Sequence, residues 1–102
     1  MNQREILEKL HTECPTYYGT ILRDEHLPEV YMPPEDFYQF ATNINEDRSP
    51  KEIIPIIEHV WEDNDGNEYH DFYIIYRRTV YTTQIKITKG KPKKEEEVIV
   101  IG

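Results

Sequence analysis

The stretch that decides the fold is IIEHVWEDNDGNEYHDFYII, residues 56–75. Two runs rich in apolar side chains flank Asp65-Gly66, a dipeptide typical of the type I′ turn in a two-residue β-hairpin loop. Because such a loop determines how its two strands pair, we expect Trp61 opposite His70 and His59 opposite Phe72. One face of the hairpin would then carry Ile57, His59, Trp61, His70, Phe72 and Ile74, and the other Ile56, Glu58, Val60, Asp71, Tyr73 and Ile75.

The β pattern continues from this hairpin toward the end of the chain. Residues 68–88 are either one long bent strand or two strands, because the pattern runs past Arg77 and Arg78 with no Gly or Pro. The Lys-rich segment 89–94 predicts a loop, and residues 98–101 (VIVI) predict a last strand. An unpaired VIVI strand is prone to aggregate, so we expect its own sheet or a second chain to cover it.

The first half of the chain predicts two helices. Asn2 and Glu5 have the spacing of a capping box, and they indicate a helix over 2–13. Residues 34–44 begin at the second of two consecutive prolines and repeat apolar side chains from Phe37 at helical spacing.

Two further segments lie between these elements. Residues 16–32 fit either a short strand or a helical turn. Ser49 and Pro50 are typical of a helix start, but Pro55 would remove a hydrogen bond and clash with the preceding turn. We therefore expect one helical turn after Ser49, and then a strand over 56–62.

These elements together predict an α+β fold, with two N-terminal helices (about 2–13 and 34–44) packed on a C-terminal antiparallel sheet. The length of 102 residues suits a single domain over 1–102. Within it, residues 1–52 would form a mainly helical acidic part and residues 53–102 an antiparallel β part.

The charge is distributed unevenly along the chain. Residues 1–71 hold 17 acidic and 5 basic side chains, whereas residues 72–102 hold 3 and 7, so the two parts carry −12 and +4. The total of −8 disfavours direct binding to nucleic acid or to anionic membranes, since both depend on Lys and Arg. The sequence shows neither an apolar membrane span nor a signal peptide, and we expect a cytoplasmic protein.

Two groups of residues have the residue types of a metal-binding site. Asp63, Asp65 and Asn67 have calcium-loop spacing, but the loop's Gly and its bidentate Glu are missing, and a tight turn favours the same residue types. His59 and His70 would be diagonal neighbours on one face of the predicted hairpin, where they could begin a zinc site or an acid–base pair.

The single cysteine, Cys14, excludes a disulfide within one chain and fits a small buried apolar residue near a helix end better than a reactive thiol. We predict no catalytic residue, cofactor or metal.

The sequence favours a non-enzymatic, small acidic protein that binds another protein with a basic surface. Immunity proteins, antitoxins and phage-encoded anti-defence factors, which inhibit nucleic-acid-handling targets, use this electrostatic logic. The alternatives are a small enzyme or metal-binding protein using the face with His59 and His70, and a structural subunit that forms homo-oligomers through residues 98–101. Candidate partner-binding residues are acidic pairs, tyrosines and one arginine: Glu46, Asp47, Glu62, Asp63, Tyr69, Tyr73, Arg77 and Tyr81.

Overall fold

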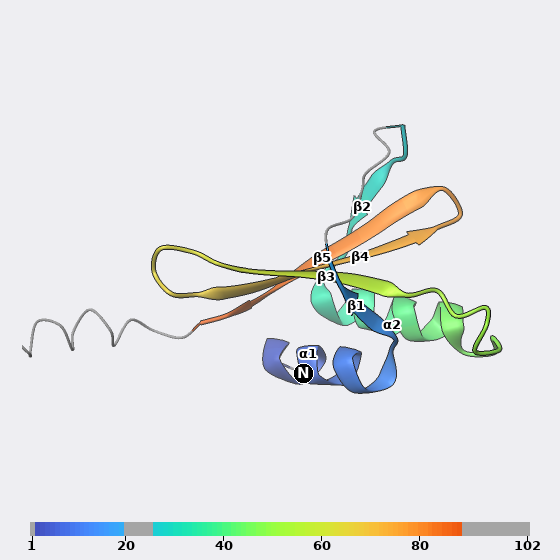
Figure 1. Cartoon of the computed structure of the whole chain (residues 1–102), viewed down its shortest axis with the longest axis horizontal. Coiled ribbons are helices and arrows are strands. Elements are labelled where there is room, and N and C mark those ends of the chain that lie inside the picture. The colour runs from blue at the N-terminus through green and yellow to red at the C-terminus, as the bar shows by residue number, and fades with distance from the viewer. Residues whose placement is uncertain (1, 20–25, 89–102) are drawn as a thin grey trace, which may run out of the picture.

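The computed structural model describes residues 2–19 and 26–88, which form an α+β structure (Figure 1). The elements along the chain are α1 (Gln3–Glu13), β1 (Thr16–Tyr18), β2 (Glu29–Tyr31), α2 (Pro34–Asn45), β3 (Ile56–Glu62), β4 (Glu68–Tyr76) and β5 (Thr79–Ile87). The strands form one sheet in the order β1-β3-β4-β5-β2, and both helices lie on the same side of it. The predicted loop at 89–94 and strand at 98–101 lie outside the described residues.

The sheet is mixed, so the prediction of an antiparallel sheet is confirmed only for its central strands. The central strands β3, β4 and β5 are antiparallel, but β1 pairs parallel with β3, and β2 pairs parallel with β5. Both edge strands come from the segment 16–32, which the sequence left open. Each has only three residues, too few for a clear alternating pattern, and its pairing depends on partners about 40 to 50 residues away in the chain.

The two predicted helices are confirmed. The side chain of Asn2 accepts a hydrogen bond from the Glu5 N–H (2.8 Å), and the Glu5 carboxylate accepts one from the Asn2 N–H (2.9 Å), which completes the capping box. α2 begins with Pro34, whose fixed φ suits the first turn of a helix. The apolar stripes of both helices are buried against the sheet and include Ile6, Leu7, Leu10, Phe37 and Ala41.

Strand β3 covers the residues that the sequence predicted, 56–62. After Ser49 the chain makes a turn, in which the Glu52 N–H donates to the Ser49 carbonyl (2.9 Å). The side chain of Asn45 then bonds both the N–H and the carbonyl of Ile54, at 2.7 and 3.0 Å. This amide ties the end of α2 to the chain just before Pro55, so the strand begins at Ile56 beyond the proline.

The predicted register of the β3–β4 hairpin was wrong by one residue. The loop has three central residues: the Gly66 N–H donates to the Asp63 carbonyl (3.1 Å), Gly66 has φ +85°, and the Asp63 N–H donates to the Asn67 carbonyl (3.1 Å). This is a type I turn followed by a left-handed glycine, which uses the same Asp and Gly residues as the predicted type I′ turn. The loop pairs Val60 with His70 and His59 with Asp71.

The one-residue shift moves whole sets of side chains to the other face, since side chains alternate along a strand. His59 and His70 therefore lie on opposite faces of the sheet, which contradicts the proposed His59/His70 face. Glu58, and not His59, lies on the same face as His70, and the side chain of Glu58 is buried.

Residues 68–88 contain two strands, with the turn at Arg77 and Arg78. Tyr76 pairs with Thr79, and both arginines have positive φ, +51° and +62°. Two successive residues with positive φ between paired strands form a type I′ turn, whose usual residues are Asn and Gly. The turn therefore carried no recognisable sequence signal.

We call the sheet face toward α1 and α2 the inner face, and the opposite one the outer face. The inner face carries the apolar core, in which Ile56, Phe72, Ile74, Ile85 and Ile87 contact the buried stripes of the helices. Partners across a strand pair share a face, so the pairing assigns Tyr17, Ile57, Tyr73, Thr82 and Tyr31 to one row of the outer face, with one residue from each strand.

Candidate functional sites

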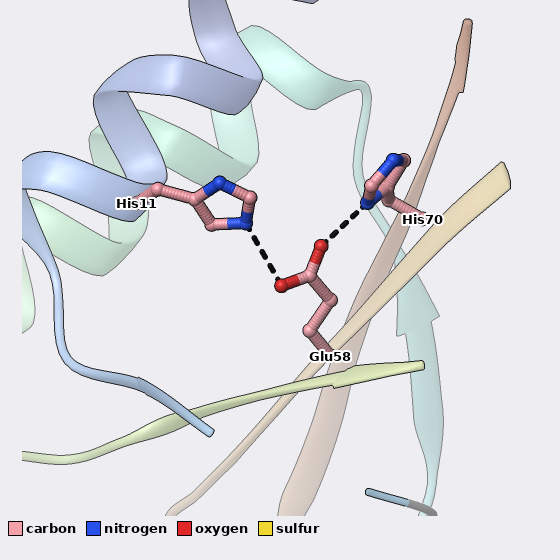
Figure 2. Close-up of side chains that lie close together, drawn as sticks. All are labelled: His11, Glu58 and His70. Carbon is pink, nitrogen blue, oxygen red and sulfur yellow. Dashed lines mark hydrogen bonds and ion pairs between the residues drawn. The ribbon is translucent and has the colours of Figure 1, made fainter. Parts of the chain in front are cut away.

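The inner face holds a cluster of two histidines and a glutamate, His11, Glu58 and His70, of which Glu58 and His70 are buried (Figure 2). His11 Nε2 lies 2.8 Å from Glu58 Oε1, and His70 Nδ1 lies 2.5 Å from Glu58 Oε2. The side chain of Glu58 is 0% exposed, that of His70 is 7% exposed, and that of His11 is 33% exposed. We call these three residues the His–Glu cluster.

Elements that are far apart in the chain bring the cluster together. His11 lies in the last turn of α1, one residue after the buried Leu10, and it points from the helix toward the sheet. Glu58 and His70 come from the neighbouring strands β3 and β4. The ring of Phe72 lies 6.3 Å from the His11 ring and 6.4 Å from the His70 ring, and it forms an apolar wall beside the cluster.

The cluster continues to a second carboxylate, since His70 Nε2 lies 2.5 Å from Glu68 Oε2. An ionised carboxylate only accepts hydrogen bonds, so each of the three nitrogen–oxygen contacts needs one proton. His70 therefore has a carboxylate oxygen beside each of its two ring nitrogens, and Glu58 lies between two imidazoles.

The outer face is rich in exposed aromatic side chains. Tyr17 is 58% exposed and Tyr31 is 62% exposed, and they stand at the two ends of the row across the five strands. Trp61 and Ile75 on the same face also leave more than a third of their surface exposed. An open depression on this face is lined by residues that include Glu29, Tyr31, Tyr73 and Gln84.

Polar contacts hold some of these aromatic groups in place. Asp71 accepts hydrogen bonds from Trp61 Nε1 and Gln84 Nε2, both at 2.7 Å. The Trp61 ring stacks on the Tyr69 ring with centroids 4.2 Å apart and planes 11° from parallel. Contacts within the chain therefore hold two of the largest outer-face side chains, Trp61 and Tyr69, in place.

The predicted partner-binding residues do not form one surface. Glu46 and Asp47 follow the end of α2, whereas Glu62 and Asp63 lie at the β3–β4 hairpin loop, and Figure 1 shows these two places at opposite ends of the molecule. Of the remaining candidates, Tyr69 and Tyr73 both lie on the outer face, and the Tyr69 hydroxyl donates a hydrogen bond to Asp63.

The other two candidates lie elsewhere. Arg77 is at the β4–β5 turn, with its guanidinium 5.1 Å from the centre of the Tyr76 ring. Tyr81 faces inward and packs on Phe40, with ring centroids 4.4 Å apart.

Asp63 organises the hairpin loop. Its side chain accepts hydrogen bonds from the N–H groups of Asp65 and Asn67, the Asn67 amide and the Tyr69 hydroxyl, at 2.9 to 3.2 Å. Desolvation alone would raise the pKa of Asp63, but the bonds from Asn67, Tyr69 and Asp65 outweigh it and lower the pKa to about 2. These contacts support the interpretation of the segment as a turn rather than a calcium loop.

Cys14 is buried next to the end of α1, as predicted. Desolvation and then the neighbouring Glu13 carboxylate raise the pKa of the thiol to about 11. The nucleophile is the thiolate, so this cysteine is not activated for chemistry at neutral pH.

Sequence reasoning missed Glu58, His11, Tyr17 and Tyr31. For Glu58 there was a usable signal, because this acid stands between Ile56 and Val60 at the spacing of one strand face. His11 had none, since its partners lie 47 and 59 positions further along the chain. Tyr17 and Tyr31 belong to strands that depend on distant partners.

Comparisons with protein-family models, with curated proteins and with solved structures find no match to this chain. Within the described residues, neither helix has the length and apolar character needed to cross a membrane.

Proposed function

We propose that this chain is a protein-binding module that docks a folded partner on the outer face of its sheet. The observation that carries the proposal is the row Tyr17, Ile57, Tyr73, Thr82 and Tyr31, which crosses all five strands on the face that neither α1 nor α2 covers. Tyrosine and tryptophan are enriched at the centres of protein interfaces, because each combines a large rigid apolar area with a polar group.

Charge indicates the kind of partner. The described residues hold 15 acidic and 7 basic side chains, a net charge of −8. A partner whose apolar patch is bordered by Lys and Arg would be attracted over a distance and would associate faster at low salt. A nucleic-acid-handling protein has such a surface, so inhibition of such a target, as by an immunity protein, an antitoxin or an anti-defence factor, is the form of this function that we favour.

The test uses two adjacent tyrosines on opposite faces of β1. Tyr17 faces outward, whereas Tyr18 follows it in the strand and is 73% exposed on the opposite side. A partner captured from lysate would be identified and purified, and its Kd for the chain measured by calorimetry at two salt concentrations. We expect Tyr17→Ala and Tyr31→Ala each to raise Kd by about 5-fold or more, Tyr18→Ala to leave it unchanged, and salt to weaken binding.

Two results would reject this proposal. One is a purified partner whose affinity is the same for the wild type, Tyr17→Ala and Tyr31→Ala. The other is an affinity that rises with salt, because the acidic charge would then not assist binding.

A further inference from the structure

We propose that His11, Glu58 and His70 bind a zinc ion, with His11 Nε2, a Glu58 carboxylate oxygen and His70 Nδ1 as ligands. One ligand atom from each residue lies within 4.8 Å of the other two. Figure 2 shows both imidazole nitrogens directed at the two oxygens of Glu58. This site is independent of the outer face, so the two proposals stand or fall separately.

The distances suit the insertion of an ion after a small adjustment. Zinc binds imidazole nitrogen and carboxylate oxygen at about 2.0 to 2.2 Å, which places neighbouring ligands of a tetrahedral site about 3.3 to 3.6 Å apart. The two nitrogen–oxygen pairs are now 2.8 and 2.5 Å apart, as hydrogen-bonded pairs are. The two hydrogen-bonded pairs therefore have to separate by up to about 1 Å, and the ligand atoms that are now up to 4.8 Å apart have to approach one another; side-chain rotation can supply both movements.

Charge also favours a cation at this place. Glu58 is fully buried, and burying a carboxylate is costly unless a positive group compensates for it. A divalent ion would provide this charge directly, in place of protons in the two contacts with Glu58. It would also balance Glu68, the second carboxylate next to His70.

Glu68 has the position of an orienting residue. Metal-binding histidines usually donate their second ring N–H to a carboxylate or carbonyl, which fixes the orientation of the ring. With Nδ1 of His70 on the metal, its Nε2–H donates to Glu68 Oε2 at 2.5 Å.

Burial favours zinc over metals that need six ligands. The burial of Glu58 and His70 leaves access to solvent mainly on the side of His11. Two histidines and a carboxylate can also hold iron(II), but such iron sites keep several open positions. A four-coordinate zinc with a single water fits better, and this set of ligands is that of several catalytic zinc sites.

The experiment is titration of chelator-stripped full-length chain with zinc chloride by calorimetry, repeated with cobalt(II) and visible spectroscopy. We expect one zinc per chain, intense visible bands of four-coordinate cobalt, and a higher Tm with zinc. His11→Ala changes the most exposed ligand, on a helix where Ala is well tolerated, and should weaken zinc binding by more than about 10-fold. Glu68→Gln retains all three ligands and should weaken it by about 10- to 100-fold.

His59→Ala is the matched control. His59 is next to Glu58 in β3, but it is exposed and faces outward, so zinc binding should not change. The absence of stoichiometric binding by the wild type would overturn the proposal. So would binding that survives His11→Ala and Glu68→Gln unchanged while circular dichroism shows both variants to be folded.

Discussion

The two faces of the sheet are built by the same strands and have opposite characters. On the inner face, α1 and α2 bury the apolar side chains of the sheet. Glu58 lies on the same face, between His11 of α1 and His70 of β4. On the outer face, Tyr17, Tyr31 and Trp61 remain exposed. Adjacent residues of a strand point to opposite faces, so neighbours in the sequence serve different purposes. The comparison shows that the buried core and the exposed aromatic surface are separated by the alternation of side chains, not by segments of the chain.

The largest expected effect is a difference in stability between alanine variants of two neighbouring aromatic residues of β4, one on each face of the sheet. Phe72 is 0% exposed on the inner face, and Phe72→Ala should lower the free energy of unfolding by about 3 to 5 kcal/mol through cavity formation. Tyr73 is only partly buried on the outer face, and Tyr73→Ala should cost about 1 kcal/mol. Urea denaturation measures both values, and equal losses would contradict the assignment of the faces.

The next effect tests the buried carboxylate. Glu58→Gln preserves the shape of the side chain but leaves an imidazole without its acceptor, and it should cost about 1 to 3 kcal/mol in metal-free buffer. Glu62 lies in the same strand but is exposed, so Glu62→Gln should change stability by less than about 0.5 kcal/mol. Urea denaturation with a chelator present gives both numbers. If Glu58→Gln left the free energy of unfolding unchanged, the His–Glu cluster would contribute nothing to the stability of the fold.

A smaller effect of opposite sign is expected at the β4–β5 turn. Arg78 has φ +62°, a conformation that favours glycine, and Arg78→Gly should stabilise the fold by about 0.5 to 1 kcal/mol. Arg78→Ala is the control, because alanine retains the Cβ that makes positive φ unfavourable. Thermal denaturation compares the three chains, and an equal gain from Ala and Gly would refute the backbone explanation.

The smallest effect concerns pH. The pKa of Asp63 is lowered to about 2 in the folded chain, so its hydrogen bonds stabilise the fold fully above its ordinary pKa of 3.8. That contribution is lost as pH falls through the folded pKa. We expect Asp63→Asn to flatten the dependence of Tm on pH between about 4 and 2. Calorimetric scans across this range measure it, and an unchanged slope would show that Asp63 does not titrate as described.

Local signals in the sequence predicted a substantial part of the fold. The capping box at Asn2, the proline at the start of α2 and the strand after Pro55 each depend on residues within a few positions of one another. The turn at Asp65-Gly66 was also found, but two loop types share these residues, and the choice between them shifts the register by one.

The candidate sites were much less predictable. The sequence identified His70 as a site residue but paired it with His59, because the predicted register placed these two on one face. The parallel edge strands were missed as well, since three-residue strands such as β1 acquire their pairing only in the assembled sheet. Tyr69 and Tyr73 were predicted from their residue type alone. They lie on the outer face because the strand register pairs them with Trp61 and Ile57.

The sequence by itself determined the two helices, strand β3, the β character of residues 68–88, the net charge of −8 and the abundance of tyrosine. Only the tertiary structure decided which tyrosines are exposed together and which acid is buried between two histidines. The physical reason is that capping and turn formation involve short stretches of the chain, whereas burial and side-chain neighbours depend on strand register and helix packing. A single additional residue in the hairpin loop put Glu58, and not His59, beside His70.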